Sequence, residues 1–204
     1  MEFPKLIVFD FHGTLSLNTG TENTKEFEKT LKKGEYEMIK INNLKNALRK
    51  YKKTSWYQAM KDSHIDPNVM MPTLDDIIMF VDYLKENSKD TVFGIATMGE
   101  QEDFIYDMMK YAFEFKNRES PFTMNSIIGF RNIKSSEIKS QSIHDKWPHI
   151  SLIIKNLNLI NPSVVLIDDN IRVVDYMTSR GICSVIVKYY FTLDDWNRGC
   201  YVDK

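Results

Sequence analysis

The sequence predicts a doubly wound α/β fold, in which helices flank a parallel sheet. Two observations support this prediction: short apolar runs bounded by turn residues recur along the chain, and segments with helical spacing of apolar residues lie between them. Runs that are apolar on both faces are typical of strands buried in a parallel sheet. The alternation of such strands with helices favours the α/β class.

Five apolar runs are expected to form the strands of this sheet. They span residues 5–9, 92–96, 126–130, 163–167 and 183–187. Cys183 opens the last of them, and we interpret it as inert packing in a core strand. The aromatic stretch from Tyr189 to Tyr201 follows, and we interpret it as packing, a cover of the site or an interface.

Four segments between the runs carry apolar residues three or four positions apart, which predicts amphipathic helices. Their apolar residues span 74–84, 104–112, 150–159 and 173–177. Thr73 is the expected cap of the first helix, Pro148 lies near the first turn of the third, and Gly181 ends the fourth.

One interval interrupts the alternation of strands and helices. Residues 22–33, 36–52 and 55–62 have helical patterns, with a break at Gly34 and no convincing strand. The interval is too long for a plain loop. We therefore expect a single domain, residues 1–204, that carries a small helical cap insertion at residues 16–72.

Composition limits the classes of function. The chain has 204 residues, enough for one domain, and 27 basic against 28 acidic side chains give a formal net charge of −1. This balance gives no indication of nucleic-acid or membrane binding. Two cysteines are too few for a disulfide framework, and no apolar stretch approaches the roughly 20 residues of a membrane span. We expect an intracellular, cytoplasmic protein, and the sequence does not indicate its oligomeric state.

Polar side chains follow three of the predicted strands. Asp10 and His12 follow the first, Thr97 follows the second, and Asp168 with Asp169 follows the fourth. Ligands of open α/β sheets bind beyond the carboxyl ends of the strands, so these side chains are expected to converge. A strand-end aspartate is a candidate nucleophile for phosphoryl transfer.

Turns and a lysine complete the predicted site. Gly13 and Thr14 follow Asp10, and Met98 and Gly99 follow the second strand, which places backbone N–H groups where they can bind an anion. Lys146 precedes the helix that leads to the Asp168 strand and is the preferred lysine. Lys134 and Lys139 remain alternatives for the same role.

These four motifs, in this order and spacing, resemble those of the haloacid dehalogenase superfamily, and most closely its magnesium-dependent phosphatases. The resemblance implies that Asp10 attacks phosphorus to form an aspartyl phosphate, while Thr97 and Lys146 hold the phosphoryl oxygens. It also implies that Mg²⁺ binds to the Asp10 side chain, the backbone carbonyl of His12 and Asp168, with Asp169 supporting this set. Such oxygen ligands suit Mg²⁺.

His12 departs from the pattern, because these phosphatases carry a second aspartate there as general acid and base. Histidine can perform both tasks, since its ordinary pKa of about 6.5 lies near neutrality. We expect a phosphatase with impaired or pH-shifted hydrolysis of its phosphoenzyme. Two alternatives stay open: a catalytically impaired protein that binds phosphorylated ligands or protein partners, and a phosphotransferase or another chemistry of the superfamily that uses the same aspartate. The substrate class is open. His64, His144 and His149 are expected to have structural or solvent-exposed roles.

Overall fold

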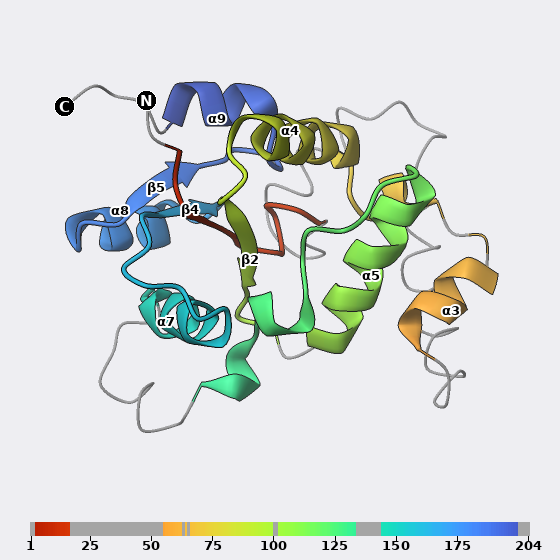
Figure 1. The fold of residues 1–204 in the computed structure, drawn as a ribbon, viewed down its shortest axis with the longest axis horizontal. Coiled ribbons are helices and arrows are strands. Elements are labelled where there is room, and N and C mark those ends of the chain that lie inside the picture. Colours follow the sequence, from red (N-terminus) through yellow and green to blue (C-terminus); the bar gives the residue numbers. More distant parts are fainter. Residues whose placement is uncertain are drawn as a thin grey trace.

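The computed structural model describes residues 3–16, 55–62, 64, 66–99, 102–133 and 144–199, with the backbone alone at Ala59, Val69 and Arg131. Its centre is a five-stranded parallel sheet in the order β3-β2-β1-β4-β5 (Figure 1). Helices lie against both faces of this sheet. The predicted α/β class with a parallel sheet is therefore confirmed.

All five predicted strands are present. Their bounds are β1 Leu6–Phe9, β2 Val92–Ala96, β3 Ile127–Ile128, β4 Val164–Asp168 and β5 Cys183–Ile186. β3 is shorter than the predicted 126–130, because a 3-10 turn ends at Ser126 and another begins at Phe130. β4 runs one residue further than predicted, so Asp168 is the last residue of the strand.

The four predicted helices are also present. They are α4 Leu74–Asn87, α5 Glu102–Phe115, α7 Trp147–Asn156 and α8 Ile171–Ser179. The described residues also form α3 Trp56–Asp62, α9 Leu193–Gly199 and a short 3-10 helix at Pro67–Val69. Thr73 is the N-cap residue of α4, although its hydroxyl makes no capping hydrogen bond. Gly181 follows α8 with a φ of +83°, a conformation that glycine adopts without strain.

Alternate residues of β1 face opposite layers of the molecule. Ile7 and Phe9 belong to the larger apolar cluster, with α4, α5 and α9, whereas Leu6 and Val8 belong to the smaller one, with α7 and α8. Figure 1 shows α4 and α9 on one side of the sheet and α7 on the other. This two-residue period is that of a strand covered on both faces.

The expectation for Cys183 is wrong. Its side chain is exposed, and only Val185 of the four β5 residues is buried. β5 is the last strand of the sheet order, so it has one neighbouring strand and its outer edge has none within the described sheet. An apolar run at such an edge is less covered than the same run in the centre.

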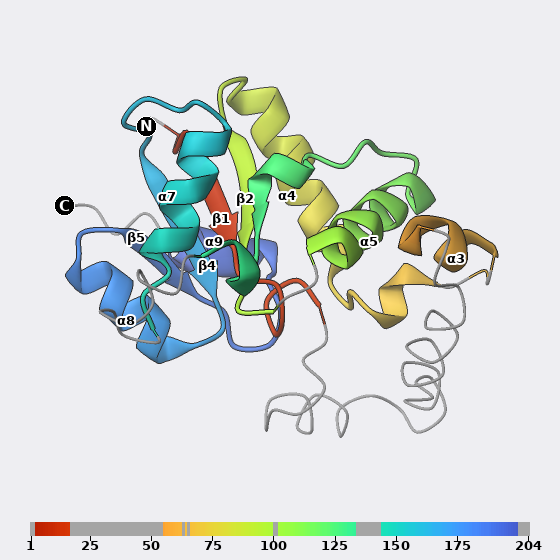
Figure 2. The ribbon, with the colours of Figure 1, turned by 90° about the horizontal axis from the view of Figure 1, so that it is seen from below.

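The described part of the predicted cap lies beside α5. The expected helix 55–62 is present as α3, and the expected helices 22–33 and 36–52 lie outside the described residues. The Trp56 ring packs on Phe104 with centroids 5.3 Å apart. Figure 2 shows α3 on the far side of α5 from the sheet. The 16–72 insertion stays a prediction. No helix within the described ranges is long and apolar enough to cross a membrane.

Candidate active site

Two buried carboxylates lie at the carboxyl ends of neighbouring strands. Asp10 follows β1 and Asp168 ends β4. Asp10 is 7% exposed and Asp168 is 1% exposed. The N–H of Asp10 donates to the carbonyl of Ile167 at 2.8 Å, which keeps the two strand ends together. The sheet order reverses between β1 and β4, and α/β proteins bind ligands at such a point.

Lys146 joins these carboxylates to a third strand. It is the N-cap residue of α7 and is 3% exposed. Its ammonium donates to the Asp10 carboxylate and, at 2.8 Å, to the carbonyl of Ala96 at the end of β2; it also lies 3.0 Å from Asp168 Oδ2. The predicted convergence of Asp10, Asp168 and Lys146 is thus observed. Lys134 and Lys139 lie outside the described residues.

Negative charge exceeds positive charge at this point. Burial raises the pKa of Asp10 to about 7, and repulsion by Asp168 and Asp169 adds to the rise, although the Lys146 ammonium opposes it. Burial, followed by repulsion from Asp168, raises the pKa of Asp169 to about 6. Burial disfavours the charge on Lys146, but the neighbouring carboxylates outweigh it and raise the pKa of the lysine. Among the described residues, Asp10 and Asp168 therefore pair with the Lys146 ammonium, and the Asp169 carboxylate adds a third negative charge near it.

The turn after β1 closes tightly against Asp169. Gly13 has a φ of +86°, and a Cβ placed on it would lie 2.2 Å from Asp169 Oδ2. The N–H of Gly13 donates to the carbonyl of Ser16 at 2.8 Å, which folds the turn back on itself. The Thr14 hydroxyl is buried and has no hydrogen-bond partner among the described residues. Glycine is required here by both conformation and space.

His12 and Thr97 flank Gly99. A Cβ placed on Gly99 would lie 3.3 Å from His12 Nε2 and 3.4 Å from Thr97 Oγ1. The Thr97 hydroxyl accepts a hydrogen bond from the N–H of Gly99 at 3.1 Å. His12 is exposed and its ring packs edge-on against Phe11, while Met98 is 46% exposed. The structure therefore places the imidazole near the hydroxyl after β2, as the strand-end argument predicts.

A buried glutamate that the sequence patterns did not single out holds the neighbouring loop. Glu102 opens α5, and its Oε1 accepts hydrogen bonds from the N–H of Gly129 at 2.9 Å and from Asn132 Nδ2 at 2.8 Å. The N–H of Phe130 donates to the Gly99 carbonyl at 3.1 Å. These bonds fix the loop after β3 against the loop after β2. A glutamate in a first helical turn normally faces water, so its sequence position gave no signal of burial.

His149 lies behind the site. It is 3% exposed, and its ring lies beside the backbone of Thr97. Burial, with the nearby charge of Lys146, lowers the pKa of His149 to about 4. The imidazole is therefore neutral near neutral pH, and its structural role stays a prediction.

The oxygens at the strand ends suit a hard divalent cation. The Oδ1 of Asp168 accepts the N–H of Asn170 at 2.9 Å, whereas its buried Oδ2 is paired with the Lys146 ammonium at 3.0 Å. No group of three or more His, Cys, Asp or Glu side chains in the described residues is arranged to hold a metal. Mg²⁺, however, is commonly held by one or two carboxylates together with water and substrate oxygens. The buried carboxylates of Asp10 and Asp168 fit that requirement, and a cation would relieve their excess charge.

Comparisons with known proteins give distant structural similarities. No protein-family model and no curated protein matches the chain. CbbY from Rhodobacter sphaeroides, solved in complex with phosphate, is 10% identical with a TM-score of 0.49, over 94% of this chain and 89% of that one. A haloacid dehalogenase-like hydrolase from Streptococcus pneumoniae is 16% identical with a TM-score of 0.40, over 93% and 88% of the two chains. A dehalogenase is 11% identical with a TM-score of 0.42, over 92% and 86%. These similarities concern the fold alone.

Fold and site together define a class of protein. The chain is an α/β protein whose parallel sheet carries a buried carboxylate–lysine cluster at the carboxyl ends of its central strands.

Proposed function

We propose that this protein is a Mg²⁺-dependent phosphohydrolase of the haloacid dehalogenase type, which cleaves a phosphomonoester through an aspartyl phosphate on Asp10. One observation carries the proposal: the buried carboxylates of Asp10 and Asp168 meet around the Lys146 ammonium at the switch point of the sheet. Such a cluster offers a nucleophile, a cationic partner for phosphate oxygens and ligands for a metal. Positioning and charge neutralisation are what phosphoryl transfer mainly requires.

Binding comes first in the proposed mechanism. The Lys146 ammonium and the Thr97 hydroxyl hold oxygens of the phosphoryl group. The Gly13–Thr14 and Met98–Gly99 turns complete its cradle with the N–H groups of Thr14 and Met98, because those of Gly13 and Gly99 already donate to Ser16 and Thr97. The ammonium also lowers the repulsion between the Asp10 carboxylate and the phosphate. When bound, Mg²⁺ would be held by Asp10, the His12 carbonyl and Asp168, with Asp169 in support, and would neutralise charge on the phosphoryl oxygens.

Two displacements follow. A carboxylate oxygen of Asp10 forms a bond to phosphorus as the bond to the leaving oxygen breaks, and the His12 imidazolium gives its proton to that oxygen. Neutral His12 then takes a proton from water, whose oxygen attacks phosphorus and releases phosphate with regeneration of the Asp10 carboxylate. The nearness of His12 to Gly99 and Thr97 supports this role.

The test is hydrolysis of para-nitrophenyl phosphate with and without Mg²⁺ across pH. We expect Asp10→Asn to lower kcat by about a thousandfold or more, since it removes the nucleophile. Asp175→Asn, which changes an exposed carboxylate of α8, is the matched control and should retain the wild-type rate. Activity that survives Asp10→Asn unchanged would contradict the mechanism.

His12 favours one competing function, a protein that binds phosphorylated ligands with little turnover. A histidine stands where the phosphatases of this type carry the aspartate that acts as acid and base, so both proton transfers depend on a different group. Acid quenching and mass spectrometry after mixing with substrate separate the two functions. We expect a phosphoryl adduct on Asp10 that disappears faster in His12→Asp. Phosphate binding without any adduct in the wild type would support the competing function.

A further inference from the structure

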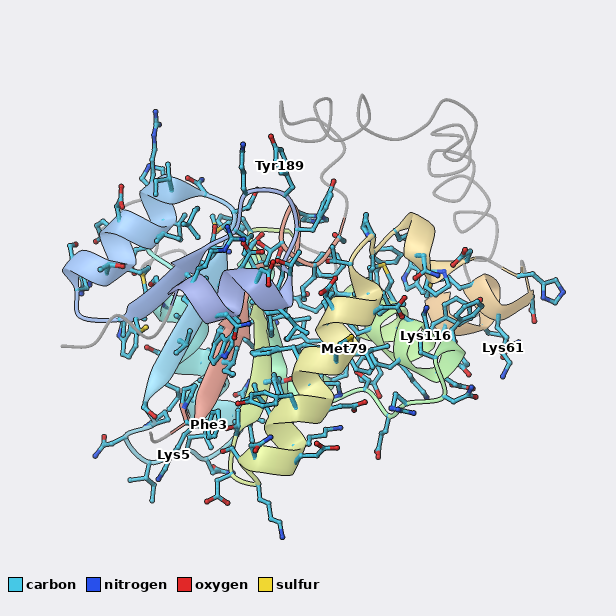
Figure 3. The ribbon with its side chains drawn as sticks, turned by 90° about the horizontal axis from the view of Figure 1, so that it is seen from above. Phe3, Lys5, Lys61, Met79, Lys116 and Tyr189 are labelled. Carbon is cyan, nitrogen blue, oxygen red and sulfur yellow. The ribbon has the colours of Figure 1, made fainter. Side chains whose placement is uncertain are left out.

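A hollow lies beside the edge strand β5. Its volume is about 560 Å³, and β5, the segment 187–192, α8 and α9 all contribute to its walls; Ser184, Ile186, Lys188, Tyr189 and Arg198 are among the lining residues. This volume falls in the range of small-molecule pockets, about 300–1,000 Å³. Figure 3 shows Tyr189 at the end of the sheet opposite Lys5, that is, beyond the carboxyl ends of the strands.

The charges that line the hollow favour an anion. Its described lining holds two cations, Lys188 and Arg198, and one carboxylate, Asp195, which leaves one net positive charge (2 − 1). Asp195 is already engaged: Oδ2 accepts from the N–H of Thr192 at 2.9 Å and from its hydroxyl at 2.7 Å, and Oδ1 lies 3.3 Å from Arg198. The Lys188 ammonium lies over the Tyr189 ring, 4.9 Å from its centroid.

The remaining walls suit an apolar body. Val174, Val185 and Ile186 face the hollow, and Tyr189 adds an aromatic ring. β5 is the edge of the described sheet, so backbone groups along its outer side have no strand partner there and can hydrogen-bond a ligand. Cations, an aromatic ring and apolar side chains therefore line one space.

The segment 187–192, which lines the hollow, is also hydrogen-bonded to the candidate active site. The N–H of Val187 donates to the carbonyl of Asp168 at 3.1 Å, that of Tyr190 to Gly13 at 3.3 Å and that of Phe191 to Thr14 at 2.8 Å. Tyr190 has a φ of 60°, which a bulky side chain rarely adopts. One face of the segment thus lines the hollow, and its backbone is bonded to the turn after Asp10.

We propose that this hollow is a regulatory binding site for a small organic anion with a flat apolar body, such as an aromatic sulfonate or carboxylate. Lys188 and Arg198 bind the anionic group, and the apolar wall of β5 and Tyr189 accommodates the ring system. Occupancy alters the turn at Gly13 and Thr14 through the bonds of residues 187–191. Binding is independent of the proposed phosphatase activity, whereas an effect on turnover rests on it.

The first test measures binding of two probes to the full chain by fluorescence. The probes are 1-anilinonaphthalene-8-sulfonate and the uncharged N-phenyl-1-naphthylamine, which share a ring system. We expect the double variant Lys188→Met/Arg198→Met to bind the sulfonate about tenfold more weakly, since charge-assisted contacts are the strong ones. Binding of the uncharged probe should change little. Lys155→Met/Arg180→Met, which changes two exposed cations elsewhere, is the matched control.

The second test uses amide chemical shifts of the wild-type chain and requires no variant. The sulfonate should shift residues 184–199, and also Gly13 and Thr14. Equal losses in the two double variants, or shifts that leave residues 184–199 unchanged, would overturn the site. Shifts confined to the hollow, with none at Gly13 or Thr14, would overturn its regulatory role. Failure of the phosphatase proposal is recognised separately, by the Asp10→Asn assay.

Discussion

The ammonium of Lys146 lies 3.0 Å from Oδ2 of Asp168 and also donates to the Asp10 carboxylate. With its bond to the Ala96 carbonyl, it connects the ends of β1, β2 and β4. A buried cation in this position offsets the repulsion between two carboxylates that would otherwise face each other in a medium of low dielectric. It therefore contributes to stability as well as to the proposed chemistry.

Replacement of this lysine is expected to destabilise the fold. Lys146→Met leaves two buried carboxylates without their cation, and the loss of one partner from such a cluster costs about 3–5 kcal/mol. Urea unfolding measures the change. Lys155→Met, at the exposed end of α7, should change the free energy of unfolding by about 0.5 kcal/mol or less. Equal changes in the two variants would contradict this reading of the cluster.

Addition of Mg²⁺ is expected to compensate for the missing lysine. The carboxylates of Asp10 and Asp168 stay paired with Lys146 in the wild type, so the metal has to compete with an ammonium. In Lys146→Met that competitor is absent, and thermal unfolding should shift upward more with Mg²⁺ than it does in the wild type. A smaller shift in the variant would show that the carboxylates do not hold the metal.

Two glycines with the same backbone conformation separate strain from steric overlap. Gly13 and Gly181 have φ values of +86° and +83°, but only at Gly13 would a Cβ overlap another group, the Asp169 carboxylate. Gly181→Ala should cost about 1 kcal/mol from backbone strain. Gly13→Ala should cost more and abolish the proposed activity, because Asp169 must move. Urea denaturation measures both costs. Equal losses of unfolding free energy in the two variants would show that overlap with Asp169 adds no cost at Gly13.

Glu102 is expected to be a positioning residue of the loops around Gly99. Glu102→Ala leaves the buried N–H of Gly129 without its acceptor, which costs about 1–3 kcal/mol. Glu102→Gln keeps a carbonyl oxygen in that place and should recover most of the stability. If the Ala variant raises KM for para-nitrophenyl phosphate while Gln restores it, the loop depends on the hydrogen bond. An identical KM in both variants would limit Glu102 to a structural role.

His149 is expected to make stability depend on pH. The folded pKa is about 4 and the ordinary pKa is 6.5, so between these values the unfolded chain binds a proton that the folded chain does not. Stability from this group is therefore complete above pH 6.5 and is lost as pH falls towards 4, by about 1.4 kcal/mol per pH unit at most. The raised pKa values of Asp10 and Asp169 act with the opposite sign.

A comparison of variants isolates the histidine. In His149→Leu the two aspartates still titrate, so the difference in unfolding free energy between wild type and variant reports His149. This difference should change steadily between pH 6.5 and 4. Ile160→Leu, which changes an exposed side chain without a titratable group, is the control and should show a constant difference. A constant difference for His149→Leu as well would contradict the lowered pKa.

Much of the site could be predicted because strand ends are local features of a sequence. An apolar run that ends at or just before Asp10, Thr97 or Asp168 marks the carboxyl end of a buried strand. Burial of Glu102 could not be predicted in the same way, because its partners, Gly129 and Asn132, lie about 30 positions further along the chain.

The sequence by itself determined the order of strands and helices and the polar groups at the strand ends, since hydrophobic period and turn residues act over a few positions. Only the tertiary structure decided which bonds Lys146 makes to Asp10 and to the Ala96 carbonyl, that Cys183 lies exposed on an edge strand, and that a hollow forms beside β5. These features depend on which strands are neighbours in the sheet. That choice is made by packing between distant segments, and no local pattern encodes it.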